Sequence, residues 1–316
     1  MGLVKPFVKW AGGKGNLIPQ LKNFYPFELE NETINKYVEP FVGGGAVLIN
    51  ILQKYNIKKA YAFDINIDLI NCYNVIKNNV EELIKELDIK EKEFKKLTDE
   101  DRQAYFYNVR KEYNSYRINE NELSIKRAGE FIFLNRTCFN GLYRVNKKGE
   151  FNVPCGKYKN PTICDSSNLR NLSFLIRNVN FQYGDYKESE KYIDNNTFVY
   201  FDPPYRPLSI TSGFTSYTKE DFNDENQKEL ANFFRKLDKT NAKLMLSNSN
   251  PKNTNKNDNF FENIYKGFNI NEISAKRMIN SNVRARGEIS ELLITNYEEM
   301  DECILENSTL KKVALS

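Results

Sequence analysis

The segment from Phe198 to Tyr205, FVYFDPPY, carries a carboxylate, two prolines and a tyrosine directly after an apolar run. The apolar run predicts a strand, and α/β proteins bind their ligands where such strands end. An exocyclic amine on a nucleobase is a poor nucleophile because its lone pair is delocalised into the ring. If the Asp202 carboxylate and the Pro203 carbonyl each accept one amino hydrogen, that lone pair can be directed at a methyl donor.

The neighbours of Asp202 suit this chemistry. Pro203 and Pro204 supply rigidity and carbonyl groups without competing N–H groups, and the Tyr205 ring offers a face on which a base can stack. Attack on a sulfonium methyl group needs position and electrostatics more than a strong base, which suits a chain with no histidine. The alternative is that Asp-Pro-Pro only terminates a buried strand.

A glycine turn near the N-terminus indicates a nucleotide-type pocket. Gly43, Gly44 and Gly45 follow a predicted strand and open a predicted helix, and Asp64 ends the next strand about twenty residues later, where an acid would hold ribose hydroxyls. The match to a dinucleotide fingerprint is incomplete, because Leu48 stands at the third glycine position. A turn needed only for a tight bend remains the alternative.

The segment FVKWAGGKGNLI invites a phosphate-loop interpretation, which fails at two positions. Val8 replaces the leading glycine, and Gly15 replaces the Ser or Thr that would hold magnesium. Its glycines still allow close approach of the backbone to a ligand, and Lys14 places a cation beside it. A cofactor with adenosine but no phosphates, such as S-adenosylmethionine, suits these residues better than NAD or ATP.

The elements that must position these residues are those of an α/β fold. KYVEPFVGGGAVLINIL and KKAYAFDIN predict strand, glycine turn, helix and strand, a unit that favours a parallel sheet. From about Ile70 to Leu134 the pattern becomes helical and charged. Strands resume with NVNFQYGDY, TFVYFDPPY, AKLMLSNSN and SELLITNY, with the helical DENQKELANFFRKL between them. One sheet is therefore interrupted by a helical insertion.

The composition limits the class of protein. With 316 residues, 40% of them hydrophobic, the chain can bury a substantial core, whereas a net charge of +4 says little about partners. Five cysteines without a C-x-x-C pair, and no histidine, give poor support to structural zinc or a disulfide framework. No apolar run approaches the roughly 20 residues of a membrane span, and no secretion signal is evident, so we expect a cytoplasmic protein.

A basic segment follows the helical insertion. The turn pairs Asn140-Gly141 and Lys148-Gly149 interrupt short β-prone runs, which predicts a hairpin. Cations can hold phosphates or read guanine, and apolar side chains can wedge between bases, although a solvated basic hairpin is the alternative. The residues concerned are Arg136, Arg144, Lys147, Lys148, Lys157 and Lys159, interleaved with Phe139, Leu142, Tyr143, Phe151 and Tyr158.

Five segments together resemble the Dam-like adenine-specific DNA methyltransferases. They are FVKWAGGKGNLI, VEPFVGGGAVL, RTCFNGLYRVNKKGEFNVPCGKY, FDPPY and ISELLITNY, and they cover nearly the entire chain in the order of the family's alpha group. The resemblance implies a Rossmann-like S-adenosylmethionine-dependent fold with an inserted, mostly helical recognition subdomain and a β-hairpin. It places the catalytic domain at residues 1–70 and 178–316, the recognition subdomain at 71–177 and the basic hairpin at 136–160.

The resemblance also implies roles for individual residues. Asp202, Pro203, Pro204 and Tyr205 would hold an adenine that is flipped out of the duplex, which the enzyme needs because a paired base cannot reach such a pocket. The cofactor would contact Trp10, Ala11, Gly12, Lys14, Phe41, Gly43, Asp64, Asp185 and Asp202, although Asp185 could equally be an acid of a surface turn. The DNA would contact Arg136, Asn140, Leu142, Tyr143, Arg144, Asn146, Pro154, Lys157 and Tyr158.

Three details qualify these assignments. Lys157 stands where the family commonly has arginine, and lysine cannot form the arginine fork, which weakens any assignment of a guanine contact. Pro154-Cys155 is the nucleophile dipeptide of the cytosine ring-carbon methyltransferases, but Cys155 lies far from any cofactor strand and is interpreted as structural or incidental. Lys276, Arg277, Arg284 and Arg286 predict a loop that contacts phosphates.

The sequence therefore predicts an enzyme that transfers a methyl group from S-adenosylmethionine to N6 of adenine in double-stranded DNA. GATC is the expected target, with related sites open, in a bacterial or phage-infected cell and associated with the nucleoid. A restriction endonuclease acting separately is a possible partner. The alternatives are methylation of the cytosine N4 amine, of RNA or of a protein glutamine, and a DNA-binding module without catalysis.

Overall fold

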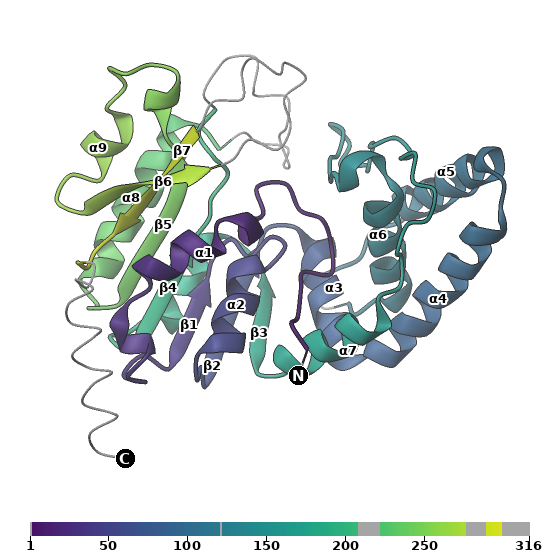
Figure 1. The fold of residues 1–316 in the computed structure, drawn as a ribbon, viewed down its shortest axis with the longest axis horizontal. Coiled ribbons are helices and arrows are strands. Elements are labelled where there is room, and N and C mark those ends of the chain that lie inside the picture. Colours follow the sequence, from purple (N-terminus) through teal and green to yellow (C-terminus); the bar gives the residue numbers. More distant parts are fainter. Residues whose placement is uncertain (1, 121, 208–221, 276–288, 299–316) are drawn as a thin grey trace.

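The computed structural model describes residues 2–120, 122–207, 222–275 and 289–298, and within them the chain forms one seven-stranded sheet. The strand order is β3-β2-β1-β4-β5-β7-β6 (Figure 1). The five strands β1 to β5 are parallel, whereas β7 runs antiparallel to both β5 and β6. The bounds are β1 Lys36–Glu39, β2 Lys59–Asp64, β3 Val179–Tyr183, β4 Thr197–Phe201, β5 Lys243–Ser249, β6 Asn269–Ala275 and β7 Ile289–Thr295.

The point where the strand order reverses lies between β1 and β4. The chain runs outward from β1 through β2 to β3 and then returns to β4 on the other side of β1, with Lys36 paired to both Lys59 and Thr197. In open α/β sheets ligands bind outside the carboxyl ends of the strands at such a reversal. The site is therefore expected beyond Glu39 and Phe201, where the two adjacent strands end.

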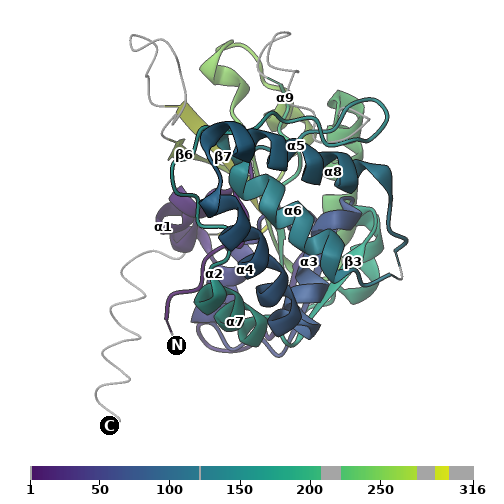
Figure 2. The same ribbon diagram turned by 90° about the vertical axis from the view of Figure 1, so that its right-hand side faces the viewer.

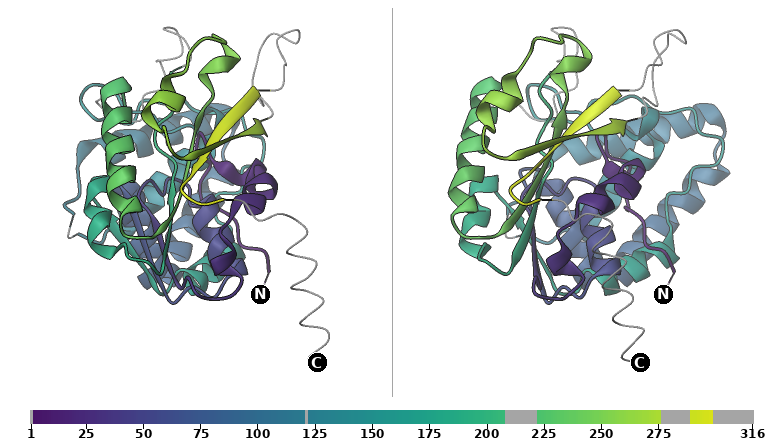
Figure 3. Two further views of the ribbon diagram at one scale, coloured as in Figure 1. Left: turned by 90° about the vertical axis from the view of Figure 1, so that its left-hand side faces the viewer. Right: turned by 60° about the vertical axis from the view of Figure 1, so that its left-hand side comes forward.

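Two apolar clusters cover the two faces of the sheet. Alternate residues of a strand point to opposite faces, so Phe198 and Tyr200 join one cluster whereas Val199 and Phe201 join the other. The second cluster includes Leu230 and Phe234 of α8 (Asp224–Asp238), and Figure 3 shows this green helix against one face. The purple N-terminal helices and α2 (Ala46–Lys54) lie on the other face (Figure 3).

A group of helices adds its apolar side chains to the first cluster. These helices lie to one side of the sheet in Figure 1 and face the viewer in Figure 2. In this group α6 contacts α3, α4 and α5. A buried ion pair ties two helices of this group together, because Arg127 of α6 donates to both carboxylate oxygens of Asp68 on α3, at 2.7 and 2.9 Å. The helices are α3 Ile67–Asn78, α4 Val80–Lys96, α5 Asp99–Ser115, α6 Ile125–Thr137 and α7 Ser166–Leu175.

Shorter helical segments complete the described chain. Their bounds are η1 Lys14–Asn16, α1 Ile18–Leu21, η2 Lys22–Phe24, η3 Phe27–Leu29, η4 Phe139–Gly141, η5 Tyr186–Tyr192, η7 Pro251–Asn253 and α9 Phe260–Ile264. No helix in the described ranges is long and apolar enough to cross a membrane.

Two features differ from the pattern that the sequence suggests. Strand β6 was not predicted, because its sequence NINEISA mixes polar and apolar residues. The basic hairpin is looser than a regular ladder: only isolated bridges join its arms in the described structure, Val145 with Phe151 and Cys138 with Cys155. Asn140, at φ 55°, turns the chain within η4.

Candidate active site

Three carboxylates meet at the carboxyl edge of the sheet. Glu39 ends β1, Asp64 ends β2, and Asp202 directly follows β4. These strands are neighbours and run in parallel, so their ends share one edge although the residues are far apart in the chain. Glu39 was not among the predicted site residues. It is buried, accepts a hydrogen bond from Tyr37 at 2.7 Å, and its pKa is raised well above the usual value by burial.

Lys14 forms an ion pair with Asp202. The distance from Nζ to Oδ1 is 2.7 Å, and the same ammonium donates to the carbonyl of Gly12 at 2.7 Å. The lysine side chain is only 4% exposed, whereas that of Asp202 keeps 20% of its surface open, enough for one carboxylate edge to meet a ligand. Burial raises the pKa of Asp202 to about 6, against the opposing charge of Lys14, so the group is a carboxylate at neutral pH.

The Tyr205 side chain is held between two charged groups. The Lys14 ammonium lies 4.6 Å from the centre of its ring, and its hydroxyl donates to Glu291 of β7. Burial, followed by the charges of Asp202 and Glu291, raises the pKa of Tyr205 well above its usual value. The hydroxyl therefore stays protonated and remains a donor.

Side chains from α8 and β5 anchor the backbone of the turn. Gln227 donates to the carbonyl of Pro204 at 3.0 Å, and Asn248 accepts from the backbone N–H of Arg206 at 3.2 Å. Gln227 and Asn248 are fully buried and bond to each other at 3.1 Å. Because buried amides with satisfied partners have little freedom, the turn is rigid before any ligand binds.

The Arg206 side chain closes the far end of the turn. Its guanidinium pairs with both oxygens of Asp224, at 2.7 and 3.0 Å, and with Asp258 at 2.7 Å. It also lies 4.2 Å from the ring centre of Phe260.

The glycine turn between β1 and α2 is shaped by its neighbours. Gly43 and Gly45 have φ of 46° and 70°, a conformation that side chains rarely adopt. A Cβ atom on Gly43 would lie 2.9 Å from the Trp10 indole, and one on Gly45 would lie 2.4 Å from the Tyr73 hydroxyl. Trp10 thus packs directly on the glycine backbone, which leaves no room for any residue with a side chain.

The Asp64 carboxylate accepts a hydrogen bond from the backbone of this turn. Its two oxygens accept the backbone N–H groups of Gly43 and Asn66, at 3.0 and 2.8 Å, and burial raises its pKa to about 6. Beside it lie two exposed apolar side chains, Ile65 at 53% and Tyr183 at 42% exposure, at the ends of β2 and β3. A partly free carboxylate beside exposed apolar surface suits a ribose and a purine ring.

The remaining predicted cofactor residues are distributed around this edge. Phe41 follows β1 and stacks on Tyr186, with ring centres 5.3 Å apart. Ala11 and Gly12 are exposed in the loop before Lys14. Asp185 is exposed and caps η5, where it accepts the backbone N–H of Lys187 at 2.9 Å. Its carboxylate therefore already has a structural partner.

An aromatic stack connects the glycine turn to the basic hairpin. Trp10 stacks on Tyr143 with ring centres 5.5 Å apart, and Tyr143 packs in turn on Phe131 and Phe151. Lys9, which was not predicted, lies 4.6 Å from the ring centre of Tyr158 at the other end of the hairpin. Only the tertiary structure brings the N-terminal segment against the hairpin.

The predicted DNA contacts divide by exposure. Asn140, Arg144, Pro154 and Lys157 are exposed, whereas Leu142, Tyr143, Asn146 and Tyr158 are partly buried. The Asn146 side chain is used within its own turn, because its carbonyl oxygen accepts the backbone N–H groups of Lys148 and Glu150. Phe139 is 52% exposed and is the most open apolar side chain of the hairpin.

Arg136 differs from the other cations of the basic segment. Its guanidinium donates twice to the carbonyl of Phe7, at 3.1 and 2.8 Å, and burial lowers its pKa. Its side chain therefore ties α6 to the N-terminal segment. Lys276, Arg277, Arg284 and Arg286 lie outside the described residues.

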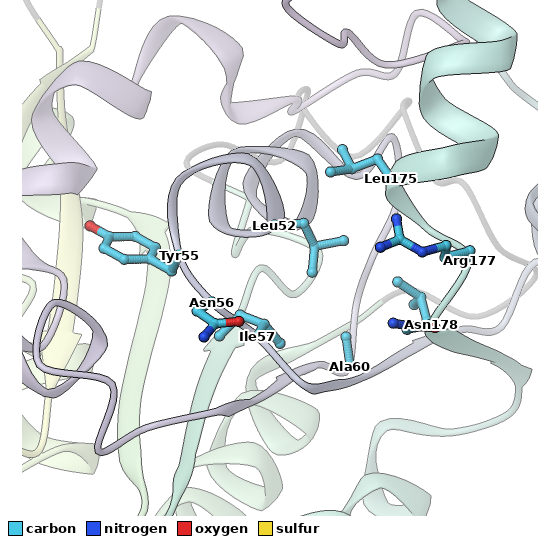
Figure 4. A pocket seen from close by; sticks show the side chains of 9 residues that line it. Leu52, Tyr55, Asn56, Ile57, Ala60, Leu175, Arg177 and Asn178 are labelled. Atoms are coloured by element: carbon cyan, nitrogen blue, oxygen red, sulfur yellow. The ribbon is translucent and has the colours of Figure 1, made fainter. Parts of the chain in front are cut away.

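Figure 4 shows a pocket at the opposite edge of the sheet, with a volume of about 200 Å³. Ala60 and Val179 near the starts of β2 and β3, together with Leu52, Leu175 and Arg177, line it. Because it opens at the amino ends of the strands, it is separate from the three carboxylates.

The fold and this edge define a class of protein. A mixed seven-stranded sheet of this order, with acids at the carboxyl ends of adjacent parallel strands, is that of the Rossmann-like methyltransferases. Residues 10–279 match the family model of the D12 class N6 adenine-specific DNA methyltransferases, and the chain belongs to this family.

Several known methyltransferases are similar to this chain over almost its full length. The chain is 55% identical to the type II methyltransferase M.MjaIII of Methanocaldococcus jannaschii, over 93% of this chain and 99% of the relative. It is 39% identical to the type II methyltransferase M1.LlaDCHI of Lactococcus lactis, over 93% and 96%. It is 32% identical to the DNA adenine methylase of Escherichia coli K12, over 92% and 94%. The predicted adenine-specific DNA methyltransferase is thereby confirmed, and adenine is favoured over the cytosine amine.

Proposed function

We propose that the turn Asp202–Tyr205 binds the target adenine after it has flipped out of duplex DNA, and that S-adenosylmethionine is the methyl donor. The observation that carries this proposal is the position of Asp202. It follows β4 at the reversal of strand order, beside Lys14 and next to the strand whose glycine turn packs on Trp10. Lys14 pairs with the Oδ1 atom of Asp202, and in this proposal the other oxygen, Oδ2, faces the adenine amine.

In this proposal Asp202 and the carbonyl of Pro203 accept the two hydrogens of the adenine N6 amine. Lys14 keeps Asp202 ionised, although burial alone would favour its protonated form. When bound, S-adenosylmethionine would supply an electrophilic methyl group, whose bond to sulfur would break as its bond to N6 forms, leaving S-adenosylhomocysteine. N6 would lose one proton, which the Asp202 carboxylate can accept and pass to solvent, because a group whose pKa is about 6 is mostly ionised near neutral pH.

Tyr205 presents its ring to the adenine face, and the anchored backbone keeps the acceptors in place. Gln227 holds the carbonyl of Pro204, so the turn needs little rearrangement when the base arrives. Preorganised acceptors of this kind act mainly through orientation, which can supply several orders of magnitude in rate.

The residues around Gly43 suit a nucleoside cofactor without phosphates. The backbone of Gly43 lies against Trp10, and Asp64, which is partly buried, precedes the exposed Ile65. We assign to the cofactor the predicted set Trp10, Ala11, Gly12, Lys14, Phe41, Gly43, Asp64, Asp185 and Asp202. Isothermal titration with S-adenosylmethionine would test this set, and we expect Asp64→Ala to weaken the binding.

We further propose that residues 71–177 form the recognition subdomain and that the hairpin 136–160 meets the DNA. Exposed Arg144 and Lys157 can bind phosphates or bases, and exposed Phe139 can fill the gap left by a flipped base. GATC is the proposed target, on the likeness of the hairpin to GATC enzymes. Sequencing of methylated adenines in a genome that expresses the chain would identify the site.

The two relatives named type II methyltransferases support a role beside a restriction endonuclease that acts as a separate protein. Because its substrate is DNA, we expect the protein to act in the cytoplasm of a bacterial or phage-infected cell, at the nucleoid. Methylated plasmid should resist the endonuclease that cuts the same site, and unchanged cutting would contradict this role.

The central test is methyl transfer by purified protein. Unmethylated plasmid and methyl-labelled S-adenosylmethionine should yield labelled N6-methyladenine, whereas label on cytosine, or none, would overturn the assignment. Asp202→Ala should lose transfer while cofactor binding stays measurable. Asp99→Ala, which removes an aspartate whose side chain is 98% exposed, is the matched control and should keep full activity. Full activity in Asp202→Ala would refute the role of the turn.

A further inference from the structure

Glu291 is an acid at the active-site edge with no role in the mechanism above. It lies on β7 and accepts a hydrogen bond from the hydroxyl of Tyr205, 86 residues earlier in the chain. The same tyrosine ring lies 4.6 Å from the Lys14 ammonium. The ring is therefore restrained both at its hydroxyl and across one of its faces.

The antiparallel direction of β7 places Glu291 at this edge. In the register of β5 and β7, Glu291 pairs with Ser249, the last residue of β5, so the start of β7 lies at the carboxyl edge of the parallel strands. Leu293 belongs to the first apolar cluster, whereas Leu292 and Ile294 belong to the second. By strand alternation, Glu291 points to the same face as Leu293.

The negative charge of Glu291 disfavours the ionised form of Asp202. Burial is the main cause of the raised pKa of Asp202, Lys14 lowers it, and the negative charge of Glu291 raises it. An acid here makes the Asp202 carboxylate harder to ionise, so charge alone gives no benefit to the acceptor. Its favourable interaction is the hydrogen bond to Tyr205, which a carboxylate accepts more strongly than a neutral group.

We propose that Glu291 is a positioning residue that fixes the position of the Tyr205 ring against the flipped adenine. The proposal rests on the proposed role of the Asp202–Tyr205 turn. A tyrosine without this acceptor can rotate about its side-chain bonds, and the base stacked on it shifts relative to Asp202. A misplacement of about 1 Å can cost on the order of a hundredfold in rate, so Glu291 acts mainly on kcat and less on KM.

A double-mutant cycle with Tyr205→Phe tests whether Glu291 acts through the tyrosine hydroxyl. We expect Glu291→Ala to lower kcat by about tenfold or more, and to add less than about twofold when Tyr205 is already phenylalanine. Glu291→Gln keeps an acceptor oxygen and should retain most of the activity. Glu272→Ala, on the exposed part of neighbouring β6, is the matched control. Additive losses in the cycle would overturn the proposal.

Fluorescence of 2-aminopurine at the target position supplies a readout that a purely structural role would not change. The flipped analogue should be quenched by stacking on Tyr205 in the native enzyme and should fluoresce more strongly in Glu291→Ala. Equal fluorescence in the two proteins contradicts a positioning role. Should Glu291→Ala not fold, as judged by thermal unfolding, Glu291→Gln completes the same cycle, and additive losses there are equally contradictory.

The same experiments separate this proposal from the role of the turn itself. Full activity in Tyr205→Ala would overturn the proposed base-binding function of the turn. Loss of activity in Tyr205→Ala together with native kcat in Glu291→Ala would overturn only the positioning role of Glu291.

Discussion

The charge of Lys14 should set the pH at which the enzyme becomes active. The Nζ atom lies 2.7 Å from Asp202, and the pKa of this carboxyl is about 6 because burial outweighs the opposing effect of Lys14. An opposite charge this close lowers a carboxyl pKa by about 1–3 units. Lys14→Met should therefore raise the midpoint of the acid limb from about 6 to about 7–9.

The direction in which activity changes with pH depends on which form of Asp202 is active. In the proposed mechanism the ionised carboxylate accepts the amine hydrogen, so we expect activity to be lost as the pH falls through the pKa of Asp202. At pH 7 a group of pKa about 6 is roughly nine-tenths ionised, a group of pKa about 7 is half ionised, and one of pKa about 9 is roughly 1% ionised. The loss in Lys14→Met at pH 7 should thus range from about twofold to about a hundredfold and shrink at higher pH.

The assay is the pH dependence of kcat/KM for DNA, which reports the free enzyme, measured from pH 5 to 9.5 at saturating cofactor. Lys14→Arg keeps the charge and is the control, with a midpoint near that of the native enzyme. A uniform loss in Lys14→Met at every pH, with an unmoved midpoint, would refute the electrostatic role of Lys14. It would leave a purely steric role for the side chain.

Four other substitutions should give distinct outcomes. Burial raises the folded-state pKa of Asp64 to about 6, so the contribution of this group to stability is present at low pH and is lost as the pH rises through about 6. Asp64→Asn should therefore raise the free energy of unfolding at pH 8 by at most about 3 kcal/mol, as measured by urea titration. The same substitution should weaken cofactor binding. Arg127→Met leaves Asp68 as an unpaired buried charge and should cost about 3–5 kcal/mol in unfolding free energy, whereas a loss below 1 kcal/mol would contradict a buried pair. Lys157→Ala should weaken DNA binding and reduce the slope of log affinity against log salt by about 1. Arg136→Ala should instead lower thermal stability and leave that slope nearly unchanged. A changed slope with unchanged thermal stability in Arg136→Ala would contradict the burial of Arg136.

The local patterns around the site could be interpreted from the chain alone. In the sheet that the structure describes, six of the seven strands lie in segments predicted as strands, because their apolar runs and turn residues are local signals. Strand β6 was not predicted because four of its seven residues are polar, and its pairing with β7 depends on tertiary position. The glycine turn was also evident, since three consecutive glycines between a strand and a helix permit few other structures.

Partners of individual side chains could not be predicted in this way. Arg136 belongs to a basic segment by sequence, but its guanidinium turns to the carbonyl of Phe7. Glu39 and Glu291 carry no motif that marks them as site residues, and Lys9 meets Tyr158 only because the N-terminal segment packs against the hairpin. Each contact depends on how separate elements dock, which no local pattern encodes.

The chain alone was enough to predict the class of enzyme, because the Asp202–Tyr205 segment, the glycine turn and three further segments stand in the order found in one family of DNA methyltransferases. The electrostatic environment of Asp202 depends instead on how the chain folds. Lys14, Asp202 and Glu291 come from three distant parts of the chain. Strands β4 and β7 bring Asp202 and Glu291 to one edge of the sheet, and η1 places Lys14 beside Asp202. Their charges act through space, and distance in space is a property of the folded chain.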